Sequence, residues 1–75
     1  MDILKIEIMK MLYSGRPTIP EMAKQIDKAF ATVHKLLKEL VQAGMVDPPR
    51  AKGAARDYHI TAFGIKYLRE NKYID

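Results

Sequence analysis

The 75-residue chain contains no cysteine and no tryptophan, and only four glycines and four prolines. Without cysteine it forms neither a disulfide nor a thiolate metal site. Its 48% hydrophobic content is too high for a disordered chain, and its glycine and proline content is in the ordinary globular range. The length and composition therefore predict that residues 1–75 form one small domain. A core this small buries only somewhat over about 60% of the unfolded surface, which favours self-association.

Long hydrophobic runs are also missing. Uninterrupted apolar stretches reach only three or four residues, whereas a membrane span needs about 20. The first five residues, MDILK, lack the basic and long apolar regions of a signal peptide. We therefore expect a cytoplasmic protein with no membrane partner.

Signatures of catalysis and metal binding are absent as well. The sequence has no glycine-rich phosphate loop, no nucleophile motif and no paired-carboxylate pattern. Its two histidines, His34 and His59, have neither cysteines nor suitably spaced carboxylates beside them. The prediction is a protein that is not an enzyme and has no cofactor and no metal site.

The charge is unevenly distributed. The chain has 13 basic and 9 acidic residues, a formal charge of +4. Residues 1–27 and 67–75 are each neutral, whereas 28–66 contains seven basic and three acidic residues and so carries the whole excess. A basic centre favours an acidic partner such as nucleic acid, although solvated lysines are common on any protein surface.

Apolar spacing predicts two helices in the first third of the chain. Between residues 3 and 14, the residues on one helical stripe are Leu4, Ile8, Met11 and Leu12. A second helix over 19–26 has Thr18 as its N-cap and Pro20 in its first turn. Its inner face is expected to consist of Ile19, Met22, Ala23 and Ile26.

A third helix is predicted over 28–43, with Asp27 as its N-cap and Gly44 as the left-handed residue after its end. At 100° per residue, its apolar face comprises Phe30, Val33, Leu37, Leu40 and Val41. The opposite face comprises Ala31, Lys35, Lys38 and Gln42. His34 lies at the edge of the apolar face.

The last third predicts a hairpin over about 45–60 and then a helix over 62–72. Pro48 and Pro49 exclude a helix, and the alternation at 57–60 is typical of a strand. Thr61 is placed to cap the final helix, whose inner face would include Gly64, Ile65 and Leu68. The fold class is therefore mainly α with a small β-hairpin (α+β), in the order helix, helix, helix, hairpin, helix.

This order resembles a winged helix-turn-helix domain, and three segments extend the resemblance. Residues 32–46, TVHKLLKELVQAGMV, are similar to the segment from recognition helix to wing in bacterial and archaeal regulators. Residues 58–64, YHITAFG, resemble the Y-x-L-T-x-x-G element of the multiple-antibiotic-resistance and arsenical-resistance repressor families. Residues 18–23, TIPEMA, are similar to the T-x-x-E-L-A second helix of those families. The chain lacks the cysteines of the metal-sensing type, so no small-molecule effector is indicated.

The resemblance implies a sequence-specific protein for double-stranded DNA, a transcriptional regulator such as a repressor. Helix 28–43 would enter the major groove, and wing 49–57 would lie on the backbone or in the minor groove. The candidate DNA-binding residues are Thr18, Lys28, Ala31, Thr32, His34, Lys35, Lys38, Arg50, Lys52 and Arg56. Lys35 suits guanine acceptors, and the methyl groups of Ala31 and Thr32 suit a thymine methyl.

A homodimer is expected as the binding unit, because one small domain reads few base pairs. Its candidate interface consists of apolar residues without an obvious place in the core: Ile3, Ile6, Tyr67, Tyr73 and Ile74. Two alternatives stay open, since a fold does not fix a function. One is a winged-helix protein–protein interaction module, and the other is a replication or plasmid-maintenance factor of the same fold.

Overall fold

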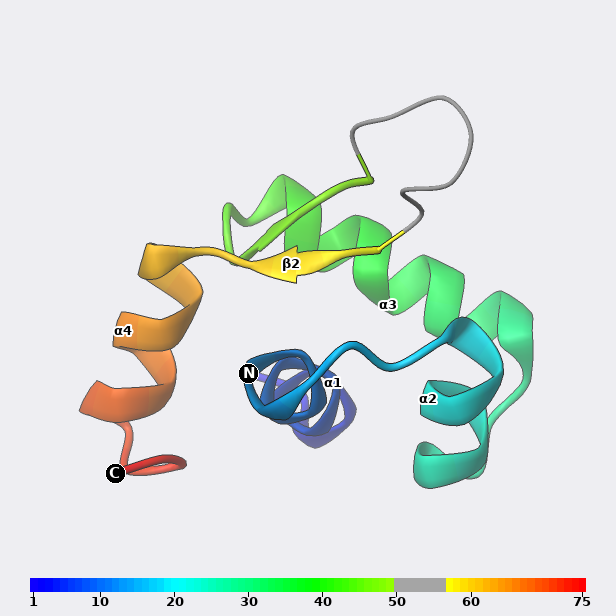
Figure 1. The fold of residues 1–75 in the computed structure, drawn as a ribbon, viewed down its shortest axis with the longest axis horizontal. Helices are drawn as coiled ribbons and strands as arrows, with labels where there is room; N and C mark the ends of the chain where they lie inside the picture. The colour runs from blue at the N-terminus through cyan, green and yellow to red at the C-terminus, as the bar shows by residue number, and fades with distance from the viewer. Residues whose placement is uncertain (50–56) are drawn as a thin grey trace.

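Four helices and a short hairpin make up the computed structural model, which describes residues 1–49 and 57–75. The elements are α1 (Ile3–Ser14), α2 (Ile19–Ile26), α3 (Phe30–Gln42), β1 (Val46–Asp47), β2 (His59–Ile60) and α4 (Ala62–Glu70). Figure 1 shows α1 end-on in the centre, between α2 and α4, with the hairpin above it. The predicted mainly helical α+β class and its element order are confirmed. Within the described residues, no helix has the length and apolar character needed to cross a membrane.

The central helix α1 contacts α2, α3, α4 and β2. Its fully buried residues are Ile6, Ile8, Met9 and Leu12, whereas Leu4 and Met11 are only half-buried. The predicted single stripe was therefore partly wrong, because neighbours on several sides bury a wider arc of α1. Ile6 is only 5% exposed and belongs to the core. Its assignment to a dimer interface is corrected accordingly.

The start of α2 follows the sequence prediction. The Glu21 N–H donates to Thr18 Oγ1 at 3.2 Å, and the Thr18 N–H donates to Glu21 Oε1 at 2.8 Å. These two bonds form a reciprocal capping box that satisfies backbone donors at the helix start. Met22, Ala23 and Ile26 are buried on the inner face of α2, and Ile19 is half-buried.

The turn between α2 and α3 differs from the prediction. Asp27 adopts a left-handed conformation with φ 56°. Its N–H donates to the Lys24 carbonyl at 3.2 Å, and the Lys28 N–H donates to the Ala23 carbonyl at 3.0 Å. Asp27 thus ends α2 and does not cap α3, which begins at Phe30 after Ala29 with no side-chain cap.

The inner face of α3 is rotated from the one predicted. Its buried residues are Val33, Leu36, Leu37 and Leu40. Phe30, predicted to be in the core, is 55% exposed. Leu36 lies about 60° from Val33 on the opposite side from Phe30, so its burial turns the face away from Phe30. Gly44 ends the helix with φ 77°, which confirms its predicted left-handed role.

A short antiparallel hairpin connects α3 to α4. Val46 pairs with Ile60 and Asp47 with His59, in agreement with the predicted pairing. Thr61 then caps α4, accepting a hydrogen bond from the Gly64 N–H at 2.9 Å and donating one to the Gly44 carbonyl at 2.7 Å. The Thr61 hydroxyl therefore joins the end of α3 to the start of α4.

Gly64 lies where α4 approaches the start of the hairpin most closely. A methyl group at this position would overlap the Met45 carbonyl oxygen and lie 2.8 Å from Cγ1 of Ile60. Met45 is buried, and its carbonyl accepts the Thr61 N–H at 2.9 Å. A methyl group would therefore require the Met45 carbonyl or the start of α4 to shift, and the bond from the Thr61 N–H to the same carbonyl opposes that shift.

Gly64→Ala is expected to lower the free energy of unfolding by about 1 to 3 kcal/mol, through overpacking against the backbone. Urea unfolding followed by circular dichroism measures the change. Gly15→Ala is the matched control, because nothing lies within 4 Å of a methyl group there. It should change stability by no more than about 0.5 kcal/mol. Equal stability of the two variants would contradict the close approach at Gly64.

Candidate functional site

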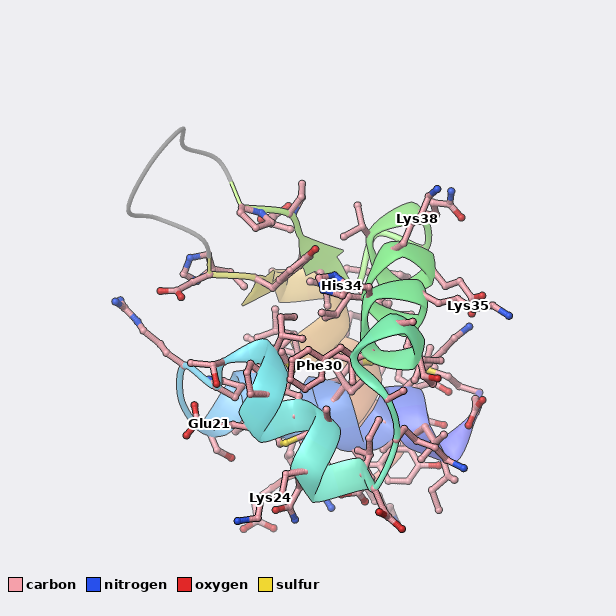
Figure 2. All side chains as sticks on the ribbon, turned by 90° about the vertical axis from the view of Figure 1, so that its right-hand side faces the viewer. Glu21, Lys24, Phe30, His34, Lys35 and Lys38 are labelled. Atoms are coloured by element: carbon pink, nitrogen blue, oxygen red, sulfur yellow. The ribbon has the colours of Figure 1, made fainter. Side chains whose placement is uncertain are left out.

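The outer face of α3 is the largest set of predicted site residues that the structure brings together. Ala31, His34, Lys35, Lys38 and Gln42 are exposed, and Thr32 is half-buried. Figure 2 shows Lys35 and Lys38 extending from α3 away from the body of the domain, while His34 lies on the side nearer the hairpin. The face therefore presents two ammonium groups, an imidazole and an amide to solvent, all able to donate hydrogen bonds.

Glu39, the one acidic residue of α3, forms an ion pair with α1. Lys5 Nζ on α1 lies 2.8 Å from Glu39 Oε1. The hydrogen bond from Lys5 lowers the pKa of Glu39 below its usual value, and the charges of Lys5 and Lys35 add to the effect. Across residues 1–49 and 57–75 this is the one salt bridge, so neither Lys35 nor Lys38 is in a salt bridge there.

Two further predicted DNA-contact residues lie near the ends of α2. Lys28 is exposed in the turn that leads into α3. Thr18 is exposed at the start of α2, but its hydroxyl already accepts the Glu21 N–H. Arg50, Lys52, Arg56 and most of the predicted wing 49–57 lie outside the described residues.

The residues predicted for a dimer interface differ in exposure. Ile3 is 69% exposed and Tyr73 is 40% exposed. Tyr67 and Ile74 are half-buried and pack against the core, while Ile6 is within it. Of the residues predicted for the interface, therefore, only Ile3 and Tyr73 are exposed, at the start of α1 and after α4.

Sequence reasoning missed Phe30 as a surface residue. Phe30 and His34 are one helical turn apart and lie on the side of α3 that faces α2 and the hairpin (Figure 2). At 100° per residue, Phe30, His34, Lys38 and Lys35 follow one another from about 60° to about 200° around the helix. They span about 140° of the circumference of the helix, and the half-buried Val41 lies within that span. Leu36 was the available signal, because a leucine at 300° moves the centre of the apolar face away from Phe30.

The outer face of α3 offers hydrogen-bond donors and apolar contacts. In the described part of the chain, no three His, Asp or Glu side chains gather as metal ligands. A cleft of about 240 Å³ between the start of α2 and the hairpin is mostly apolar and is lined by Pro17, Thr18, Ile19, Pro20, Asp57 and Tyr58.

Comparisons with known proteins add no identification: no family model, no curated protein and no solved structure matches the chain.

The two bonded glutamates predict an acid-sensitive fold. The pKa of Glu21 is lowered by its hydrogen bond with the Thr18 N–H, and that of Glu39 by its bond with Lys5. A lowered pKa in the folded state gives stability that is present above the unfolded value of 4.5 and is lost as the pH falls through the folded value. The melting temperature should therefore fall between about pH 5 and pH 3.

Glu39→Gln should reduce this acid dependence, because the variant has no carboxylate to protonate at that position. Lys5→Gln should reduce it by a similar amount, and the double variant by no more than either single change. Melting curves from pH 7 to pH 3 measure the effect. If Glu39→Gln has the acid profile of the unaltered protein, the Lys5–Glu39 pair contributes nothing to folding stability.

Proposed function

We propose that this chain is a winged helix-turn-helix protein that binds double-stranded DNA sequence-specifically and acts as a transcriptional regulator. The observation that carries the proposal is the outer face of α3. It exposes Lys35 and Lys38, and neither makes a salt bridge within the described residues. A protein-docking surface would more often present a contiguous apolar patch at this position.

The dimensions and connections of α3 support insertion into the major groove. The helix has 13 residues and is therefore about 20 Å long, and the major groove, about 12 Å wide, admits an α-helix. It follows α2 after a short turn at Asp27, as the second helix of a helix-turn-helix motif does. The N-terminal residues of such a helix contact base edges.

The individual residues have distinct roles in this proposal. Lys35 donates to the O6 and N7 acceptors of a guanine, while Ala31 and Thr32 place methyl groups beside bases. Lys28, Lys38, His34 and the Thr18 region contact phosphates, which position the domain without reading sequence. The sequence between β1 and β2 adds Arg50, Lys52 and Arg56, which in this proposal reach the backbone or the minor groove.

The proposal includes a two-fold dimer on DNA. A single module of this size buries only about 600 to 1,000 Å² on DNA, which limits its affinity. Two copies related by a dyad would place their α3 helices about 34 Å apart and read an inverted repeat. Of the residues predicted for the dimer contact, Ile3 and Tyr73 are exposed, and Tyr67 and Ile74 are half-buried.

Lys35→Ala is expected to weaken binding to a preferred duplex by about 1 to 3 kcal/mol and to relax base preference at one position. Lys66→Ala on α4 is the matched control, since it removes the same charge from another exposed lysine. Its affinity should stay close to that of the unaltered protein. Fluorescence anisotropy over a salt titration, with duplexes selected from a random library, measures both quantities.

If the unaltered protein binds no duplex, or binds every duplex with the affinity of Lys35→Ala, sequence-specific DNA binding is wrong. The alternative function, binding of a protein partner through Lys35 and Lys38, would then account better for the exposed lysines of α3.

The dimer is tested by sedimentation at micromolar protein with duplexes carrying one or two half-sites. We expect two protein chains on the two-site duplex, bound cooperatively. Ile3→Asp should abolish the cooperativity and leave binding to the single half-site intact, because Ile3 is 69% exposed and is not one of the proposed DNA-contact residues. One chain on each duplex would exclude the dimer without affecting the DNA proposal.

A further inference from the structure

Phe30 occupies an unusual position for a large apolar side chain. It is the first residue of α3, and it is 55% exposed although it precedes a fully apolar inner face. The core does not need it, since Val33, Leu36, Leu37 and Leu40 already fill that face. The exposed ring lies beside His34 on the side of α3 that faces α2 and the hairpin, whereas Lys35 and Lys38 extend from the helix in another direction (Figure 2).

Resting on the proposed function, we propose that Phe30 is a specificity-determining residue that recognises the C5 methyl group of a thymine in the major groove. The N-terminal residues of a recognition helix are those that reach base edges. A phenyl ring has no hydrogen-bonding group, and the thymine methyl is the apolar group that the major groove presents. Phe30 therefore distinguishes thymine from the other bases by apolar contact alone.

The charges around Phe30 favour DNA over an apolar protein partner. Lys28 precedes it in the turn, and the exposed Lys38 and Lys35 lie further along the same helix, about 80° and 140° around its axis from Phe30. The nearby carboxylates are committed elsewhere, because Glu39 binds Lys5 and Glu21 binds the Thr18 backbone. Asp27 is the exception and lies directly beside Lys28. An exposed aromatic ring on a helix that also carries exposed lysines is compatible with a polyanion that has methyl groups in its groove.

The test replaces single thymines of a selected duplex with deoxyuridine, which removes only the C5 methyl. At one position we expect the unaltered protein to lose affinity about fourfold, the value for one buried methyl-sized group. Phe30→Ala should bind the thymine duplex more weakly and show no further loss with deoxyuridine at that position. Phe30→Leu, which keeps an apolar side chain, should retain part of the sensitivity and serves if the alanine variant binds too weakly.

Phe63→Ala is the matched control, because Phe63 is 56% exposed on α4 and outside the α3 face. It should keep the full thymine-to-deoxyuridine ratio. Thermal melting of each variant establishes that it is folded before binding is measured.

Different results separate failure of the inference from failure of the proposed function. Specific binding with the same deoxyuridine penalties in the unaltered protein and in Phe30→Ala overturns the role of Phe30 and leaves DNA binding standing. Selection of a preferred DNA site that contains no thymine also overturns the role of Phe30 and leaves DNA binding standing. Reduced self-association of Phe30→Ala with unchanged DNA affinity identifies the ring as a protein contact and also overturns it. Absence of any preferred duplex removes the proposed function and this inference together.

Discussion

The contact between Gly64 and the Met45 carbonyl fixes how the second half of the molecule is assembled. Thr61 stabilises the same junction, since its hydroxyl bonds both the Gly44 carbonyl and the Gly64 N–H, and its own N–H donates to Met45. The end of α3, the base of the hairpin and the start of α4 thus meet within a few residues. Because the hairpin leaves this junction in a fixed direction, its position beside α3 depends on it. The proposed DNA surface depends on that same placement.

Backbone geometry, more than buried polar contacts, defines the arrangement of the helices. Among the described residues no polar or charged side chain is buried, so the core is apolar and chemically uniform. An apolar core of this kind specifies packing less strictly than one with polar networks. The left-handed residues Asp27, Gly44 and Lys72 each end a helix, with a pair of backbone bonds closing the turn. These turns set the direction of the following segment in a domain whose core is too small to do so alone.

Local signals in the sequence predicted most elements, because capping and turn chemistry acts within a few residues. Thr18, Thr61 and Gly44 all have their predicted roles. The wrong predictions share another cause. A periodic pattern locates an apolar stripe on a helix, but it does not show how much of the helix surface the neighbouring elements cover. Ile6 is buried because α1 has partners on several sides, and Phe30 is exposed because the buried face of α3 is centred away from it, toward Leu36. The Lys5–Glu39 pair joins two helices far apart in sequence, so no local spacing indicated it. The exposure of Lys35 and Lys38 was predictable, since it follows from the helical period.

The ion pair between α1 and α3 also affects which residues of the proposed interface would provide affinity for DNA and which would provide sequence specificity. By engaging Glu39, Lys5 removes the one carboxylate of α3 from competition for Lys35 and Lys38. Those two charges are then available to phosphates or guanines, and affinity on DNA comes mainly from such charge contacts, which salt screens and which ignore sequence. Discrimination must come from groups that sense base edges, and a short helix offers few of them. A ring at the first position of α3 and methyl groups one and two residues later would supply it without adding charge. In the proposed interface, therefore, Lys38 holds the DNA, and the apolar start of α3 selects the sequence together with Lys35.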